Sequence, residues 1–203
     1  MWCQLNRGIK KNGAIVLFGS EPFSSALRMS NIKNYKYDWV WEKDKSTNHL
    51  NCKKQPLRRT EIISILYKTQ CLYNPQLSQK KEKDIRPPTV KRTQAEVYGA
   101  MTSQSNREIP YNMSYPYEIL KFGCCFSIKG MSFHPTQKPV PLMEYLIRTY
   151  TNKQELILDF TIGSGTTAVA AIQTHRNFIG IEKEQKYVDI ARQRISQAEP
   201  ELF

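Results

Sequence analysis

The sequence lacks any long hydrophobic run. Its longest uninterrupted apolar stretches have about five residues, such as AIVLF at 14–18, whereas a membrane-spanning helix needs about 20. No apolar block follows a basic region at the N-terminus, so a secretory signal is not expected either. We therefore expect a soluble protein of the cytoplasm.

Cysteine is sparse and poorly spaced for the common cysteine sites. The 5 cysteines form an odd set without a Cys-x-x-Cys pair, which argues against a zinc site and a disulfide framework. No bound metal is expected. Cys124 and Cys125 are adjacent, and two interpretations stay open: a redox element, or two small residues of a reduced protein.

Acidic residues are few relative to basic ones. The chain has 203 residues, with 18 Asp and Glu against 30 Lys and Arg, and a net charge of +12. The basic residues gather in 43–59 and 80–92, among polar and aromatic residues that suit contacts with DNA. The alternative is that the charge serves solubility only. The candidate DNA-binding residues are Lys53, Lys54, Arg58, Arg59, Lys80, Lys81, Arg86, Lys91 and Arg92.

Hydrophobic periodicity predicts an α/β domain. Hydrophobic residues make up 40% of the chain, enough for a globular core. Strands are expected over 14–20, 37–43, 61–68, 155–160 and 178–182, and helices over 1–11, 21–31, 139–150, 166–174 and 184–197. The alternation of strands and helices after residue 139 is typical of a parallel sheet covered by helices, which the earlier strands would extend.

Residues 69–132 differ from the rest of the chain. They are polar and basic, contain many turn residues and have no long periodic pattern. A loop region of this length inside a compact domain is usually functional. We therefore divide the chain into a first part of a sheet domain (1–68), a recognition insert (69–132) and a second part of the same domain (133–203).

The stretch ILDFTIGSGTTAVAA, residues 157–171, predicts a ligand site. A strand ends at Asp159, a turn contains Gly163 and Gly165, and a helix follows, which places free backbone amides at a helix N-terminus. Glycines there let a ligand approach the backbone. Glu182, 19 residues after Gly163, ends the next strand, where a carboxylate binds ribose hydroxyls.

The turn favours a cofactor with a nucleoside end and an amino-acid end. It lacks the third glycine of a dinucleotide fingerprint. Asp159 suits an ammonium group better than a pyrophosphate. S-adenosyl-L-methionine has both required ends. The alternatives are a plain strand-to-helix turn without a ligand, and a nicotinamide cofactor.

Several segments of the chain resemble a known family of enzymes. FHPTQKPVPLMEYLIRTYT (133–151), the glycine turn and RNFIGIEKEQKYVDIARQRI (176–195) are similar to the C-terminal half of β-class bacterial and phage DNA amino-methyltransferases. GAIVLFGSEPF, YDWVWEK and RRTEIISILYK resemble the strands of the catalytic half, so the resemblance covers nearly the whole chain. It implies a mostly parallel, Rossmann-like S-adenosylmethionine-dependent methyltransferase sheet, with the basic insert in the position for target recognition.

The resemblance also implies a set of cofactor-binding residues. They are Asp159, Phe160, Gly163, Gly165, Thr166, Glu182, Thr136 and Lys138. Lys138 and Thr136 could hold the carboxylate of S-adenosylmethionine. His134 lies in the same motif, and two interpretations stay open: a role in the site, or a packed or solvated histidine. Phe18 is either part of the same cleft or a core residue.

The catalytic signature of that family, Asp/Ser-Pro-Pro-Tyr/Phe, is not found in the sequence. RPPT at 86–89 begins with a cation and lacks a ring, and SEPF at 20–23 has one proline. In the family this loop accepts hydrogen bonds from the target amine and stacks on the flipped base. The catalytic residues are therefore unassigned. We expect one strand to be missing at the N-terminus, which leaves an apolar groove beside the strand ending at Asp159.

The leading hypothesis is a site-specific DNA methyltransferase acting on the exocyclic amine of adenine. Three alternatives remain: a cytosine-N4 methyltransferase, an inactive DNA-binding remnant and a nicotinamide-dependent oxidoreductase. The resemblance implies double-stranded DNA as a partner and a role in restriction-modification or phage protection. A cognate restriction endonuclease and a homodimer are further candidate partners, in the cytoplasm of a bacterial or phage-infected cell.

Overall fold

The computed structural model describes residues 1–85, 109–125, 133–134 and 136–200. The chain divides into two compact units. The first contains Met1–Asn74 and Glu118–Phe203, and the second contains Pro75–Tyr117. The first unit carries the α/β architecture that the sequence predicts.

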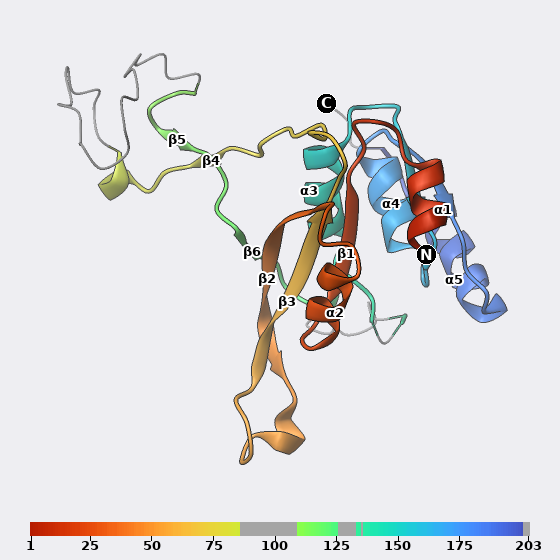
Figure 1. Ribbon diagram of the computed structural model, residues 1–203, viewed down its shortest axis with the longest axis horizontal. Coiled ribbons are helices and arrows are strands. Elements are labelled where there is room, and N and C mark those ends of the chain that lie inside the picture. Colours follow the sequence, from red (N-terminus) through yellow and green to blue (C-terminus); the bar gives the residue numbers. More distant parts are fainter. Residues whose placement is uncertain (86–108, 126–132, 135, 201–203) are drawn as a thin grey trace. The chain divides into compact units, whose positions relative to one another are not determined.

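A four-stranded sheet forms one part of the first unit (Figure 1). Strand β3 runs antiparallel to both of its neighbours, β1 and β2, and β2 runs parallel to β6. Three of the four strands therefore share one direction. In sheet order the strands are β1 (Ile15–Gly19), β3 (Arg58–Leu66), β2 (Tyr35–Thr47) and β6 (Ile119–Lys121).

A second, two-stranded parallel sheet pairs β7 (Leu156–Asp159) with β8 (Asn177–Gly180). Helix α4 (Thr166–Gln173) connects these strands, and α5 (Gln185–Ser196) follows β8. The other helices are α1 (Trp2–Gly8), α2 (Phe23–Met29) and α3 (Val140–Tyr150). The predicted α/β class with a mostly parallel sheet is confirmed, and the predicted strands and helices lie within a few residues of those observed.

Helix α3 packs against both sheets. Its buried residues Leu142, Leu146 and Tyr150 join Trp39 and Ile63 in the core of the four-stranded sheet. The Trp39 Nε1–H donates to the Tyr150 hydroxyl at 2.6 Å, and burial raises the pKa of Tyr150. Ile147 of the same helix packs with Ala170 and Ala171 of α4. The helix therefore fixes the two sheets against each other within this unit.

No strand of the described chain pairs with the free edges of β1 and β7. The two sheets are separate, although the sequence pattern suggested one continuous sheet. A cavity of about 630 Å³ lies between β1 and β7. It is lined by residues of β1, β7 and α1, among them Val16, Leu17, Ile157 and Leu158. The apolar groove expected beside the strand ending at Asp159 is therefore present.

The second unit has little regular structure in the part that can be described. Strands β4 (Ser78–Gln79) and β5 (Met113–Ser114) pair antiparallel, and η2 (Glu82–Asp84) is a short 3₁₀ helix. Strand β6 falls in the predicted insert but belongs to the sheet of the first unit. Its three residues are too few for a periodic pattern. None of the helices seen has the length and apolar character needed to cross a bilayer.

Candidate functional site

The turn between β7 and α4 uses both of its glycines. Gly163 has a φ of 52° and Gly165 a φ of 82°, values that favour glycine because other residues are strained there. A Cβ on Gly165 would lie 2.9 Å from the Cβ of Ala191 on α5. A Cβ on Gly163 would only contact the His134 ring, at 3.6 Å. Gly165 therefore allows α5 to pack tightly against the turn.

Two carboxylates follow the strands of the second sheet: Asp159 is the last residue of β7, and Glu182 comes two residues after β8 ends at Gly180. Asp159 accepts hydrogen bonds from the Thr167 hydroxyl at 2.5 Å and the Thr161 amide at 3.0 Å. Glu182 Oε2 accepts from the Gly163 amide at 3.0 Å. The pKa of Glu182 is lowered, first by the backbone amide of Glu184 and then by those of Lys183 and Gly163. Both carboxylates thus lie next to the glycine turn, and Glu182 is ionised at neutral pH.

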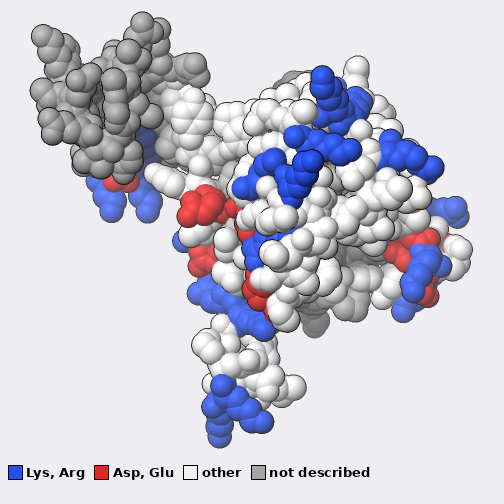
Figure 2. Space-filling model, in the orientation of Figure 1, with Lys and Arg blue, Asp and Glu red and all other residues white. Residues whose placement is uncertain are grey.

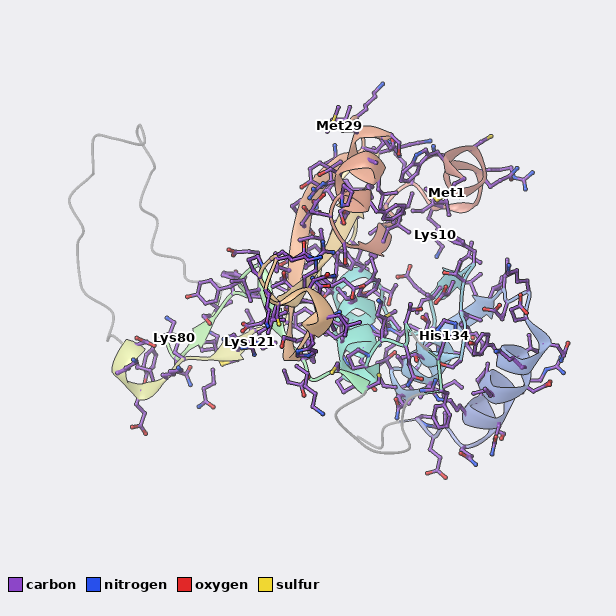
Figure 3. The ribbon with its side chains drawn as sticks, turned by 90° about the horizontal axis from the view of Figure 1, so that it is seen from below. Met1, Lys10, Met29, Lys80, Lys121 and His134 are labelled. Carbon is purple, nitrogen blue, oxygen red and sulfur yellow. The ribbon has the colours of Figure 1, made fainter. Side chains whose placement is uncertain are left out.

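The segment before α3 is held against the same turn. Gln137 Oε1 accepts hydrogen bonds from the Phe133 amide at 2.9 Å and the Ser164 hydroxyl at 3.1 Å. His134 lies beside α5 (Figure 3), with its ring centroid 4.2 Å from that of Tyr187. Thr136 bonds to the His134 ring through its amide and its hydroxyl. The His134 side chain is thus packed and hydrogen-bonded at the edge of the candidate site.

Lys138 reaches from this segment to the four-stranded sheet. Its Nζ donates to Glu61 Oε1 at 2.5 Å. The ammonium lies 5.0 Å from the ring centroid of Phe18 and 5.8 Å from that of Trp41. Phe18 is partly buried against the core and also lines the cavity, so it has both of the roles considered from the sequence.

The cavity brings most of the predicted cofactor residues together. Its lining includes Thr136, Lys138, Asp159, Phe160, Gly163 and Thr166. Glu182 is linked to this lining by its hydrogen bond from the Gly163 amide. Gly165 is not part of the lining and packs against Ala191 of α5. Residues that are up to 46 positions apart in the chain, from Thr136 to Glu182, therefore form one site.

One residue that the sequence analysis missed supports the turn from behind. Arg194 Nη1 donates to the Ser164 carbonyl at 2.6 Å, the Ser164 hydroxyl at 3.1 Å and the Thr166 hydroxyl at 3.2 Å. Burial lowers the pKa of Arg194. Arg194 is three positions after Ala191, so both lie on the helix face that meets the turn. The sequence carries no local signal for this contact, because it depends on how α5 packs against the turn.

The predicted DNA-binding residues divide between the two units. Lys53, Lys54, Arg58 and Arg59 are exposed in the outer part of the β2–β3 hairpin, where Figure 2 shows Lys and Arg side chains at the protruding tip. Lys80 and Lys81 belong to the second unit, and Lys80 Nζ donates to the Tyr111 carbonyl at 3.0 Å. Arg86, Lys91 and Arg92 lie outside the described residues.

The fold is of the α/β class, and its candidate site is a cavity beside the glycine turn between β7 and α4. A family model described as "DNA methylase", for N6 and N4 methylases, matches residues 1–193. The chain therefore belongs to this DNA methylase family. A curated relative, the type II methyltransferase M2.MboI of Moraxella bovis, is 44% identical over 74 residues, which are 36% of this chain and 27% of the relative. The M.HinfI methyltransferase of Haemophilus influenzae is 40% identical over 36% of this chain and 20% of its own length.

Solved structures share the fold over most of the chain. The complex of M1.HpyAVI with S-adenosylmethionine (SAM) has a TM-score of 0.62 at 26% identity, covering 94% of this chain and 78% of that one. The PvuII DNA methyltransferase, a cytosine-N4-specific enzyme, has a TM-score of 0.58 at 17% identity, with 92% and 64% covered. At that identity, the second likeness concerns the fold alone. The matches to the curated relatives span about a quarter of their length or less.

Proposed function

We propose that this chain forms the cofactor-binding and DNA-contacting part of an S-adenosylmethionine-dependent DNA methyltransferase. The methyl group would go to the exocyclic amine of adenine. One observation carries the proposal: a single cavity gathers the glycine turn, Asp159 and Lys138, with Glu182 bonded to its rim. Family membership and the fold of a relative solved with this cofactor support it.

The charges of the site suit the two ends of S-adenosylmethionine. Glu182 would accept hydrogen bonds from the ribose hydroxyls, since its carboxylate is ionised and lies just beyond the end of β8. Asp159 would pair with the ammonium group of the amino-acid end, and Lys138 with its carboxylate. When bound, the cofactor supplies an activated methyl group. The chain supplies the groups that orient it.

The gap between β1 and β7 is the place for the catalytic segment. On one face of the second sheet, Ile157 of β7 and Phe178 of β8 pack against helices α3 and α4. Leu158 and Ile179 are about half exposed on the other face, although parallel sheets are normally buried on both faces. We propose that a strand followed by an Asp-Pro-Pro-Tyr loop occupies the gap, as the family resemblance implies. That loop would polarise the target amine and stack on the flipped base.

Double-stranded DNA is the proposed substrate. The exposed cations of the β2–β3 hairpin would contact phosphates, and the second unit, with exposed Tyr115 and Tyr117, would contribute to recognition. Adenine is proposed as the target because of likeness to adenine enzymes of the family, with cytosine N4 as the alternative. Identification of the methylated base in DNA, as N6-methyladenine or N4-methylcytosine, distinguishes the two.

Replacement of Glu182 by alanine tests the cofactor assignment. We expect Glu182→Ala to weaken binding of S-adenosylmethionine by about 1–3 kcal/mol, because charge-assisted hydrogen bonds to the ribose are removed. Isothermal titration calorimetry on the 203-residue chain measures the change. Glu199→Ala is the matched control, because it removes an exposed carboxylate elsewhere. Equal affinity of the Glu182 variant and the unmodified chain would reject the ribose assignment.

A further inference from the structure

Glu61 lies on β3 between two lysines that come from different parts of the chain. Its Oε1 accepts from Lys138 Nζ at 2.5 Å, and its Oε2 pairs with Lys43 Nζ at 2.8 Å. The Glu61 side chain is 10% exposed, against 17% for Lys43 and 21% for Lys138. Both carboxylate oxygens are therefore engaged in a largely desolvated cluster, and neither partner was apparent from the sequence.

The cluster has a surplus of positive charge. It holds two ammonium groups and one carboxylate, and Glu61 is the only acidic partner that the described chain gives to either lysine. Aromatic rings form part of the surroundings, because Lys43 Nζ lies 4.7 Å from the Trp41 ring centroid and Lys138 Nζ 5.0 Å from that of Phe18. Rings attract cations but do not neutralise them. A second carboxylate would balance the cluster.

The cavity limits where that second carboxylate can come from. Of the three charged residues in the cluster, Lys138 alone lines the cavity. Phe18 and Asp159, which are outside the cluster, line the cavity as well. An ammonium has three donors, and Glu61 accepts from one of them. The remaining donors leave Lys138 able to bind an anionic group in the cavity while Glu61 holds the lysine in place.

We propose that Glu61 is a positioning residue that fixes Lys138 for the carboxylate of the cofactor's amino-acid end. This inference rests on the proposed function. Glu61 acts through Lys138 and does not touch the cofactor itself. Because β3 begins at Arg58 in the basic hairpin, the same carboxylate also links the proposed DNA-contacting strand pair to the segment that precedes α3.

Two ligands that differ in the amino-acid end test the inference. S-adenosylhomocysteine carries that end, and 5′-methylthioadenosine lacks it. In Glu61→Gln the two ammonium groups face each other without a carboxylate, so Lys138 moves away from its position. We expect the affinity for S-adenosylhomocysteine to fall about 10- to 150-fold, the range that corresponds to loss of one charged hydrogen bond. The affinity for 5′-methylthioadenosine should stay within about twofold.

A double-mutant cycle separates positioning from general stability. Lys138→Met should reproduce the selective loss, and Glu61→Gln combined with Lys138→Met should be no weaker than Lys138→Met alone. Glu42→Gln is the control, because Glu42 pairs with Arg59 and Lys121 on the same sheet. Additive losses, an equal fall for both ligands or unchanged affinity in Glu61→Gln would each contradict the proposal. If the unmodified chain bound neither ligand, the proposed cofactor function itself would be wrong.

Discussion

Replacing Gly165 by alanine is expected to lower the free energy of unfolding by about 2–5 kcal/mol. The φ of 82° at this position costs a residue with a Cβ about 1–2 kcal/mol. The added carbon would also lie 2.9 Å from Ala191 Cβ and 3.0 Å from its Cα, and overpacking of this kind costs about 1–3 kcal/mol. Chemical denaturation followed by circular dichroism measures the loss.

Other glycines of the chain provide the controls. Gly163→Ala should cost only the backbone part, about 1–2 kcal/mol, because its nearest neighbour, the His134 ring, is at an ordinary contact distance of 3.6 Å. Gly8→Ala has open space around it and should change little. Adding Ala191→Gly to Gly165→Ala should restore part of the stability. If Gly165→Ala cost no more than Gly163→Ala, the tight contact between α5 and the turn would be refuted.

The second large effect is expected in DNA binding. Replacing Lys53, Lys54, Arg58 and Arg59 by alanine should weaken DNA binding about 10- to 100-fold at moderate salt, because phosphate contacts dominate affinity. The slope of log affinity against log salt should fall by about 0.9 for each phosphate that the variant no longer neutralises. Fluorescence anisotropy with a labelled duplex, titrated at several salt concentrations, gives both values.

An equal change of charge elsewhere controls for general electrostatics. Exposed cations away from the hairpin serve this purpose: Arg7, Lys11, Lys33 and Arg192. Their replacement by alanine should leave most of the salt slope intact. A slope that stayed unchanged in the hairpin variant and fell in the control variant would place the DNA surface elsewhere on the protein.

The fold was largely predictable because most of its elements carry a local signal. The apolar run AIVLF at 14–18 forms most of strand β1, and proline at the start of α3 marks a helix N-terminus. Local signals do not predict strands that form only because they hydrogen-bond to a neighbouring strand. Strand β2 continues to Thr47 through polar residues because Thr47 pairs with Arg58 of β3. Strand β6 exists because it adds to β2.

Part of the arrangement of the candidate site could be predicted from local signals as well. The glycine turn and Glu182 follow from backbone geometry and spacing along neighbouring strands, and the structure joins them through the Gly163 amide. Glu61 is 77 residues from Lys138, and Arg194 is 30 from Ser164. Contacts over such distances depend on how sheet, helix and turn pack together, which no local pattern encodes.

The central claim is that the chain binds cofactor and DNA but needs a catalytic strand and loop in the gap between β1 and β7. Methyl transfer from labelled S-adenosylmethionine to unmethylated bacterial DNA tests it most directly. The assay compares the 203-residue chain with a form extended at its N-terminus by a strand and an Asp-Pro-Pro-Tyr loop. We predict that only the extended form incorporates label, mainly as N6-methyladenine. Label incorporated by the 203-residue chain itself would contradict the claim, and residues 20–23 and 86–89 would become the candidates for the catalytic loop.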